Sequence, residues 1–263
     1  MTGIVRSEWI RIWRPSFRYG GIGVLAAFSV LISLFIYSSL SDASTNTGPG
    51  FGATTAADLE QPGGMLHALG SVSTLAGIVL LSLWAIAAAS DYDTGLIRVL
   101  VQAEPSRTKL LAAKIIALTM FTGLATAVTV LITAAIARPL ARFNGVDTDP
   151  WKIDTAIEMA KGSFNFLIPA LVWGLIGLTI AVLTKSSGTA IGVGIGWLLV
   201  VENLIGIAAP DITDYLPGGT LNAVASGGTA DLTWTAALGI TALYGTAATA
   251  ASLLTFNKRD IVD

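Results

Sequence analysis

The sequence has no cysteine and only one histidine, and charged residues make up just 12% of it. The lack of cysteine excludes disulfides, thiolate zinc sites and thiol catalysis. The single histidine, His67, has no His or Cys partner for a metal site, so we interpret it as an interfacial residue. Soluble domains carry about 25% charged residues. The 53% share of hydrophobic residues and the mean hydropathy of +0.72 therefore indicate an integral membrane protein.

Six apolar segments are long enough to cross a bilayer core about 30 Å thick, which takes roughly 20 residues of helix. They lie at about 20–40, 66–90, 110–137, 163–184, 188–208 and 234–256. Residues 185–188 alone separate the fourth span from the fifth, so these two form a tight hairpin. We therefore expect an all-α integral membrane protein with six transmembrane helices and one domain over residues 1–263.

Six spans put both termini on the same side of the membrane. Most basic residues also lie on that side. Eleven of the fifteen Lys and Arg residues lie there: Arg6, Arg11, Arg14, Arg18, Arg98, Arg107, Lys109, Lys114, Lys185, Lys258 and Arg259. Cytoplasmic segments are enriched in Lys and Arg. Both termini and the 91–109 loop are therefore predicted to be cytoplasmic, with extracytoplasmic loops at 41–65, 138–162 and 205–233.

Residues 7–20 are predicted to form an amphipathic helix that lies in the plane of the inner leaflet, within a cytoplasmic segment 1–19. Basic residues are expected on one side and aromatic ones on the other, with Ser7 as the N-cap and Pro15 bending or ending the helix. Arg11, Arg14 and Arg18 fall at helical spacing and define the basic side. The helix is either a positive-inside anchor or a lever that transmits force to the first span.

Two outer segments have different patterns. Residues 41–64 are small, polar and rich in Gly and Pro, which is typical of a mobile loop. Residues 149–162 space apolar residues between charged ones, so they form either a short helix on the outer surface or a solvated connector.

The fifth span begins with small residues on one helix face: Gly188, Gly192 and Gly196. This spacing lets helices approach closely in lipid, either within the chain or between two subunits. Glu202, near the outer end of the span, either snorkels to water or has a functional role. Pro210, Pro217 and Gly218 interrupt the apolar stretch that follows, which predicts re-entrant broken helices that close the path on the outside.

A compact charged segment joins the second and third spans. Thr94 is expected to cap a short helix that runs to about Glu104 and ends before Pro105. This helix has an apolar side, and Arg98 and Gln102 share the other. Positive-inside tethering explains the basic residues but not the amphipathic helix, which suits docking into a groove of a soluble partner.

This segment resembles the coupling segment of the membrane subunits of ABC-2-type ABC transporters, close to the bacitracin-export and multidrug-export permeases. The resemblance rests on Asp91, Gly95, Leu96 and Arg98, then Pro105, Ser106 and Arg107, then Lys114. The family has Glu where Asp91 stands and Thr where Leu96 stands. The resemblance implies a cytoplasmic coupling helix seated on a separate ATPase subunit, in which Asp91, Gly95, Arg98, Pro105, Arg107 and Lys114 couple ATP hydrolysis to transport.

The same resemblance implies the remaining partners and the location. Two copies of a cytoplasmic ABC ATPase would bind ATP and Mg, because no G-x-x-x-x-G-K-[ST] motif occurs in this chain. A second permease subunit, identical or related, would complete the path. The chain is then a non-enzymatic, multi-pass subunit of a bacterial cytoplasmic membrane exporter, with lipid around it, no nucleic acid partner and no cofactor of its own.

Two other functions stay open at this stage. A lipid-modifying membrane enzyme would need clustered intramembrane His, Asp, Glu or Ser groups. The other is an ATP-independent transporter, either a proton-coupled carrier, which usually has acids near the bilayer midplane, or a passive channel. Cargo is expected to be amphipathic or hydrophobic (a drug, peptide or lipid), since Trp84, Trp173 and Trp197 suit such a substrate, although packing and interfacial anchoring explain them equally well.

Overall fold

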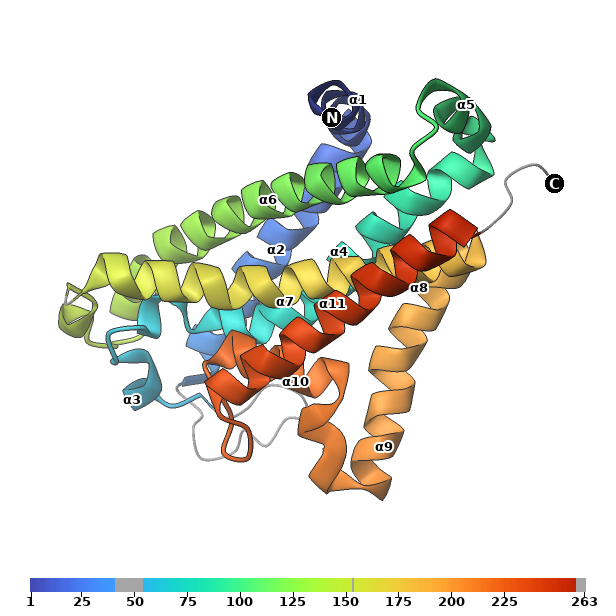
Figure 1. The fold of residues 1–263 in the computed structure, drawn as a ribbon. Coiled ribbons are helices and arrows are strands. Elements are labelled where there is room, and N and C mark those ends of the chain that lie inside the picture. The colour runs from blue at the N-terminus through green and yellow to red at the C-terminus, as the bar shows by residue number, and fades with distance from the viewer. Residues whose placement is uncertain (41–53, 153, 259–263) are drawn as a thin grey trace.

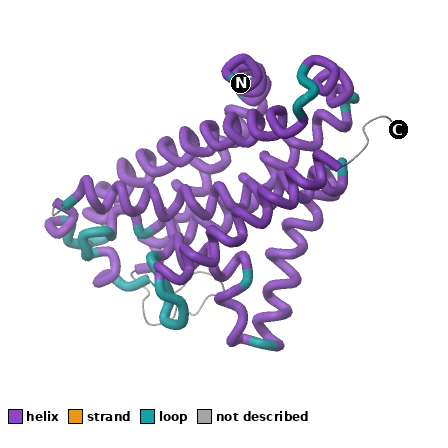
Figure 2. Tube along the Cα trace, viewed as in Figure 1, coloured by secondary structure: helices purple, strands orange, loops and turns teal. Residues whose placement is uncertain are grey.

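The structure, a computed structural model, describes residues 1–40, 54–152 and 154–258. Over these residues it is built of helices joined by short loops (Figure 2). Six helical segments are long and apolar enough to cross a membrane: Pro15–Ser39, Gly64–Asp93, Arg107–Phe143, Thr155–Thr184, Ser187–Ala208 and Trp234–Lys258. The prediction of an all-α, multi-pass membrane protein is thereby confirmed.

The first half of the chain contains two spans and their end pieces (Figure 1). Its elements are α1 (Thr2–Ile12), α2 (Pro15–Ser39), α3 (Ala56–Leu59), a 3₁₀ turn (Gly64–Leu66), α4 (Ala68–Asp93) and α5 (Leu96–Ala103). In Figure 1, α1 is seen almost end-on while α2 runs down from it, so the two helices meet at a steep angle. Pro15 is the first residue of α2, where its missing N–H costs no hydrogen bond.

The second half contains four spans and the broken outer segment. Its elements are α6 (Arg107–Phe143), a 3₁₀ turn (Asp149–Lys152), α7 (Thr155–Thr184), α8 (Ser187–Gly196), a π turn (Trp197–Val201), α9 (Glu202–Ala208), a 3₁₀ helix (Pro210–Tyr215), α10 (Pro217–Ser226) and α11 (Trp234–Lys258). The predicted hairpin between α7 and α8 is present, with Lys185 in the left-handed conformation at the turn.

The bundle is organised around α4, which contacts α2, α6, α7, α8 and α10. Its closest neighbour is α7, and two glycines make that approach close. A Cβ at Gly77 would collide with the Trp173 ring, and a Cβ at Gly174 with the Trp84 ring. Trp84 is fully buried and donates its indole N–H to the Thr122 hydroxyl at 3.0 Å. Packing therefore accounts for two of the three tryptophans that were considered for cargo.

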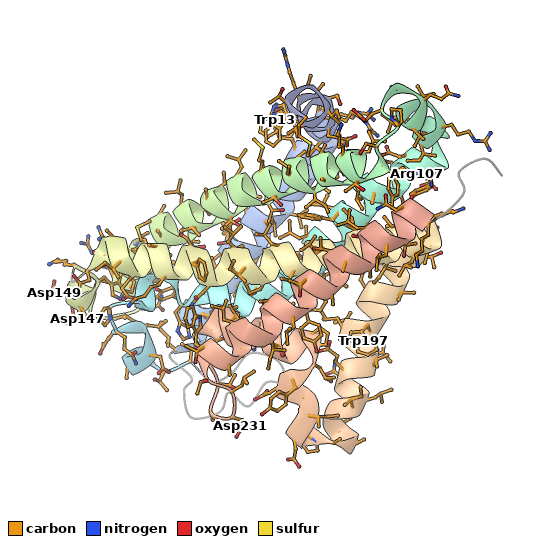
Figure 3. The ribbon with its side chains drawn as sticks, viewed as in Figure 1. Trp13, Arg107, Asp147, Asp149, Trp197 and Asp231 are labelled. Carbon is orange, nitrogen blue, oxygen red and sulfur yellow. The ribbon has the colours of Figure 1, made fainter. Side chains whose placement is uncertain are left out.

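The bundle has two distinguishable ends. We call the end that carries α1, α5 and the last turn of α11 the α5 end, and the opposite one the α3 end (Figure 1). Figure 3 shows Trp13 and Arg107 near the α5 end, and Asp147 and Asp149 at the α3 end. The two predicted cytoplasmic segments that are described thus lie together.

Several predicted boundaries are wrong. Ser7 is no N-cap: it lies inside α1, which begins at Thr2, and its hydroxyl donates to the Ile4 carbonyl at 2.8 Å. Much of the predicted 138–162 loop is helix, because α6 continues through Pro139 to Phe143 and α7 begins at Thr155. The separate outer helix expected at 149–162 is instead a 3₁₀ turn at Asp149–Lys152 followed by the first turns of α7.

The outer loop predicted at 41–65 is only partly described, since residues 41–53 lie outside the described residues. Its second part contains α3, which a capping box stabilises: the Asp58 amide donates to the Thr55 hydroxyl at 3.3 Å, and the Thr55 amide to the Asp58 carboxylate at 2.9 Å. These hydrogen bonds hold the pKa of Asp58 below its ordinary value. This part of the predicted loop therefore has helical structure.

Candidate functional site

The short helix α5 is held between two spans at the α5 end. Gly95, in the left-handed conformation at φ 69°, turns the chain from α4 into α5. The predicted cap is wrong, because Thr94 ends α4 instead and donates its hydroxyl to the Ser90 carbonyl at 2.6 Å. The predicted end of the helix before Pro105 is confirmed. The sequence therefore predicts the helix correctly but misplaces its first turn.

One side of α5 packs on the bundle and the other is open. Ile97 is buried, and Leu100 and Val101 pack beside it on the same apolar cluster. Arg98, Val99 and Gln102 are exposed on the other side, and Val99 is 58% exposed. An exposed apolar residue flanked by polar ones on a fixed helix is a surface suited to a partner's groove.

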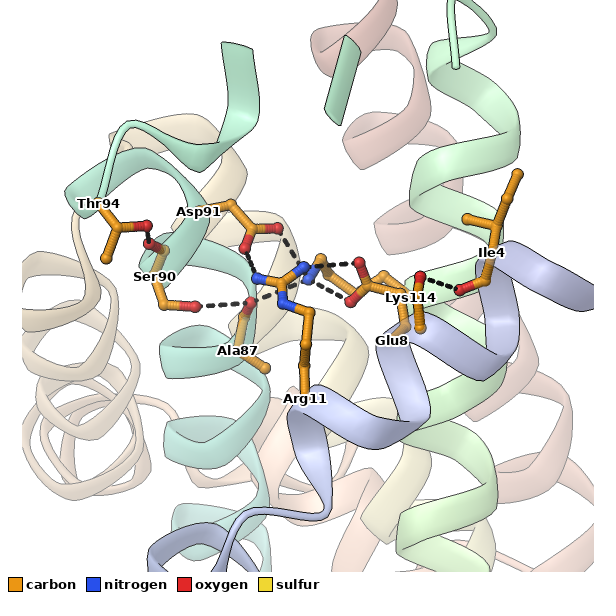
Figure 4. Close-up of polar contacts among 9 residues, drawn as sticks. Ile4, Glu8, Arg11, Ala87, Ser90, Asp91, Thr94 and Lys114 are labelled. Carbon is orange, nitrogen blue, oxygen red and sulfur yellow. Dashed lines mark hydrogen bonds and ion pairs between the residues drawn. The ribbon is translucent and has the colours of Figure 1, made fainter. Parts of the chain in front are cut away.

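Four charged side chains form a closed ring beneath α5, which we call the four-charge ring: Glu8, Arg11, Asp91 and Lys114 (Figure 4). Arg11 pairs with Glu8 at 2.7 Å and also with Asp91. Lys114 pairs with Glu8 at 2.8 Å and with Asp91 at 2.9 Å. The ring thus connects α1, the end of α4 and the start of α6.

The ring is electrically balanced, and three of its members are buried while the Arg11 side chain is 22% exposed. Glu8 is 3% exposed, Asp91 2% and Lys114 7%. Lys114 also donates to the Ala87 carbonyl at 3.2 Å. Burial of Arg11 lowers its pKa, but its hydrogen bond to Asp91 and the charges of Asp91 and Glu8 outweigh burial, so the pKa of Arg11 is raised. Two anions and two cations therefore compensate one another, and removal of any one leaves its two neighbours with one partner each and the ring with an unbalanced charge.

The ring changes the interpretation of the N-terminal helix. Arg11 was expected on the solvent side with Arg14 and Arg18, but it points inward to Asp91. The helix ends at Ile12 and restarts at Pro15, so residues on either side of this break do not share one face. Trp9 and Trp13 stack with ring centroids 5.1 Å apart. The helix α1 is thus fixed to α4 and α6 by charge as well as by apolar packing.

The six residues predicted to couple to an ATPase lie in four different places. Asp91 and Lys114 are buried in the four-charge ring, and Gly95 forms the turn. Arg98 and Pro105 are exposed. Arg107, the first residue of α6, donates to the Asn257 carbonyl of α11 at 3.5 Å. Of the predicted charged contacts, Arg98 is thus the one that the structure leaves on the open surface, while Asp91 and Lys114 are placed beneath it.

Sequence reasoning missed Glu8 and the inward role of Arg11. Glu8 is the one acidic residue among the first 40, and it stands three residues before Arg11, which permits a pair within the helix. Its other partner, Lys114, is 106 residues away, and no local pattern predicts that contact. The available signal was a lone acid inside a basic segment.

The glycine face of the fifth span is open. A Cβ added at Gly188, Gly192 or Gly196 would meet no atom within 4 Å among the described residues. Packing within the chain therefore does not explain these three glycines. Gly194, by contrast, faces the bundle, because a Cβ there would lie 2.7 Å from Leu81.

Glu202 does not snorkel to water. It is 7% exposed, and its Oε1 accepts hydrogen bonds from the Trp197 indole at 2.7 Å and from the Gly218 amide at 2.9 Å. Pro210 and Pro217 each begin a short helix, as their fixed φ favours. The predicted broken helices after the fifth span are therefore present, and Glu202 contacts the start of the second one.

A pocket of about 540 Å³ opens at the α3 end, between the 58–71 segment, α7 and the end of α10. Polar and glycine residues line most of it, among them His67, Glu158 and Asn165. Glu158 pairs with Lys161 at 2.7 Å on the same helix. Among the residues the structure describes, no group of three or more His, Cys, Asp or Glu side chains is placed to hold a metal ion.

Comparison with protein families matches residues 62–262 to one described as "Protein of unknown function (DUF2705)". The match covers five of the six spans, α5, and the ring residues Asp91 and Lys114, and the chain belongs to this family. A search of curated proteins finds no match.

Proposed function

We propose that this member of the DUF2705 family is the membrane-spanning subunit of an ATP-driven exporter of the ABC-2 type. The observation that carries the proposal is α5: a short amphipathic helix with an exposed outer side, set between two spans and seated on a buried ring of charges. In this proposal the α5 end is cytoplasmic, both termini lie there, and the membrane is the bacterial cytoplasmic membrane.

The four-charge ring supports a mechanical role for α5. A helix that transmits a conformational change from a partner must be fixed rigidly to the spans that move with it. The ring joins α1 to the end of α4, which leads into α5, and to the start of α6, which follows α5. Ile97 of α5 packs in one apolar cluster with residues of these three helices. Movement of α5 is therefore transmitted to at least three helices together.

The ATPase is proposed to be a separate protein, present in two copies, because the chain has no phosphate-binding loop of its own. Arg98 would meet this partner directly, since its guanidinium offers a rigid set of donors for carboxylates and carbonyls. Asp91 and Lys114 would act through the ring, without touching the ATPase. ATP and Mg would bind to the partner.

A second permease subunit, identical or related, is proposed to pack against the first and fifth spans. The open glycine face at Gly188, Gly192 and Gly196 supports this, because it lets a neighbouring helix approach closely in lipid. Val193 on the same helix is 52% exposed and Leu199, in the π turn, also 52%. The transport path would run between the two subunits and carry an amphipathic or hydrophobic substrate.

The test is purification of the tagged chain with co-expressed ABC ATPase subunits encoded near it, followed by assay of ATP hydrolysis. Loss of one desolvated charged contact at an interface costs about 2–5 kcal/mol, so Arg98→Ala should weaken ATPase binding about 30-fold or more. The matched control is Arg142→Ala, an exposed arginine at the α3 end. Normal export and ATPase binding in Arg98→Ala would remove the main support for the proposal.

The two alternatives lead to other outcomes. A lipid-modifying enzyme would act on lipid in membranes that contain the chain without any ATPase. An ATP-independent carrier or channel would move its substrate in vesicles reconstituted with the chain alone. Either result, with no effect of added ATPase, would overturn the exporter assignment.

A further inference from the structure

The fifth span is not a continuous α-helix. The helix α8 ends at Gly196, a π turn occupies Trp197–Val201, and α9 begins at Glu202. A π turn holds one residue more than a regular turn, is rare, and is frequent at functional sites. It also changes which side chains meet across the turn.

The π turn brings together two side chains that are five residues apart. The Trp197 indole N–H donates to the Glu202 carboxylate at 2.7 Å. In a regular α-helix of 3.6 residues per turn, residues five apart are separated by about 140° of rotation. This contact therefore depends on the π turn. Figure 3 shows Trp197 part-way along the fifth span.

The same carboxylate reaches the broken segment beyond the span. Glu202 Oε1 accepts the Gly218 amide at 2.9 Å, at the start of α10. A negative charge is favoured at the amino end of a helix, where amides are free and the dipole is positive. A Cβ at Gly218 would collide with this carboxylate, so the glycine makes the approach possible.

The elements between these contact points are held to the bundle largely by hydrogen bonds. The Tyr244 hydroxyl of α11 donates to the Tyr215 carbonyl at 2.7 Å, and the Thr220 hydroxyl of α10 donates to the Asp214 carbonyl at 2.8 Å. The outer side of α9 is open: Leu204 is 61% exposed and Ile207 82%. A segment with few buried apolar contacts opens at lower free energy than the packed core.

We propose that the π turn is a hinge and that the Trp197–Glu202–Gly218 contact is the latch that positions α10. Relaxation of the π turn to a regular helix turns α9 by about one residue, or roughly 100°, relative to α8. That rotation separates Trp197 from Glu202 and withdraws the carboxylate from α10. The role of the latch rests on the proposed exporter function. In the latched state α10 closes the outer end of the transport path, and in the unlatched state that end is open.

The test uses hydrogen–deuterium exchange on the chain alone, reconstituted in lipid nanodiscs. It compares wild type with Glu202→Gln, which removes the charge, and Trp197→Phe, which removes the indole N–H donor and keeps an aromatic ring. The matched control is Asp211→Asn, at an exposed carboxylate on the neighbouring 3₁₀ helix. Deletion of Val200, which is 54% exposed, makes a further variant. It places Trp197 and Glu202 four residues apart on a regular α-helix, so the latch stays and the hinge is removed.

Amides at 218–220 and at 199–205 should exchange about tenfold faster in Glu202→Gln and several-fold faster in Trp197→Phe, and each variant should affect both windows. They should be unchanged in Asp211→Asn, and the 199–205 window should exchange more slowly than wild type when Val200 is deleted. Exchange within twofold of wild type in both latch variants would overturn the latch. Unchanged exchange at 199–205 after the deletion would overturn the hinge. Because no ATPase is present, failure of the latch leaves the exporter proposal standing. Failure of the exporter proposal leaves the hinge and latch but removes their assignment to closing a transport path.

Discussion

Asp91→Asn is the sharpest perturbation of the four-charge ring, because it removes one buried charge while keeping the size of the side chain. Asp91 is 2% exposed and pairs with Arg11 and Lys114, so the substitution leaves two cations facing Glu8 alone. Breaking a buried ion pair by removing one partner costs about 3–5 kcal/mol. At about 2–4 °C per kcal/mol for a chain of this size, the melting temperature should fall by roughly 6–20 °C.

The assay is thermal unfolding followed by tryptophan fluorescence in nanodiscs. Asp93→Asn is the matched control, since Asp93 lies two residues further on, is exposed, and accepts a hydrogen bond from the Ser187 hydroxyl at 3.5 Å. A double variant, Asp91→Asn with Lys114→Met, restores charge balance to the ring. It should recover about 1 kcal/mol or more relative to the sum of the single changes. Equal melting temperatures for Asp91→Asn and Asp93→Asn would refute the reasoning.

Three further predictions concern glycines. Gly174→Ala should destabilise the chain by about 1–3 kcal/mol through overpacking against Trp84, whereas Gly123→Ala, with no atom within 4 Å, should be neutral or slightly stabilising, as measured by thermal unfolding. Gly95→Ala should lower the free energy of unfolding by about 1–2 kcal/mol because the backbone at this position is left-handed. Gly95→Asn should lower it less, and equal unfolding of the Ala and Asn variants would argue against that conformation. Gly192→Cys should form an oxidative crosslink between two copies in membranes, while Gly123→Cys should not. If both variants remain monomeric after oxidation, the interface lies elsewhere.

Local sequence patterns were sufficient to predict the spans, the hairpin at Lys185 and the helix before Pro105. Each depends on neighbouring residues: a long apolar run, a two-residue turn, or a proline that ends a helix. The breaks at Pro210 and Pro217 were predicted for the same reason. These features need no knowledge of which helices lie side by side.

The four-charge ring and the π turn could not be predicted in this way. The partners of Glu8 and Arg11 lie about a third of the chain away, and the break before Pro15 changes the face that Arg11 presents. Residues 197–201 are Trp, two Leu and two Val, which are equally compatible with a regular helix. Only the contacts of Glu202 with Trp197 and Gly218 distinguish this turn.

The central claim, that α5 binds an ATPase, is tested most directly by a photo-crosslinking amino acid at Val99, which is 58% exposed on the outer side of α5. In cells that express the chain with its ATPase, irradiation should join the two proteins. The same amino acid at Phe143, 90% exposed at the α3 end, should give no such product. An ATPase crosslink from Phe143 but not from Val99, or from neither position in a membrane that exports, would contradict the account.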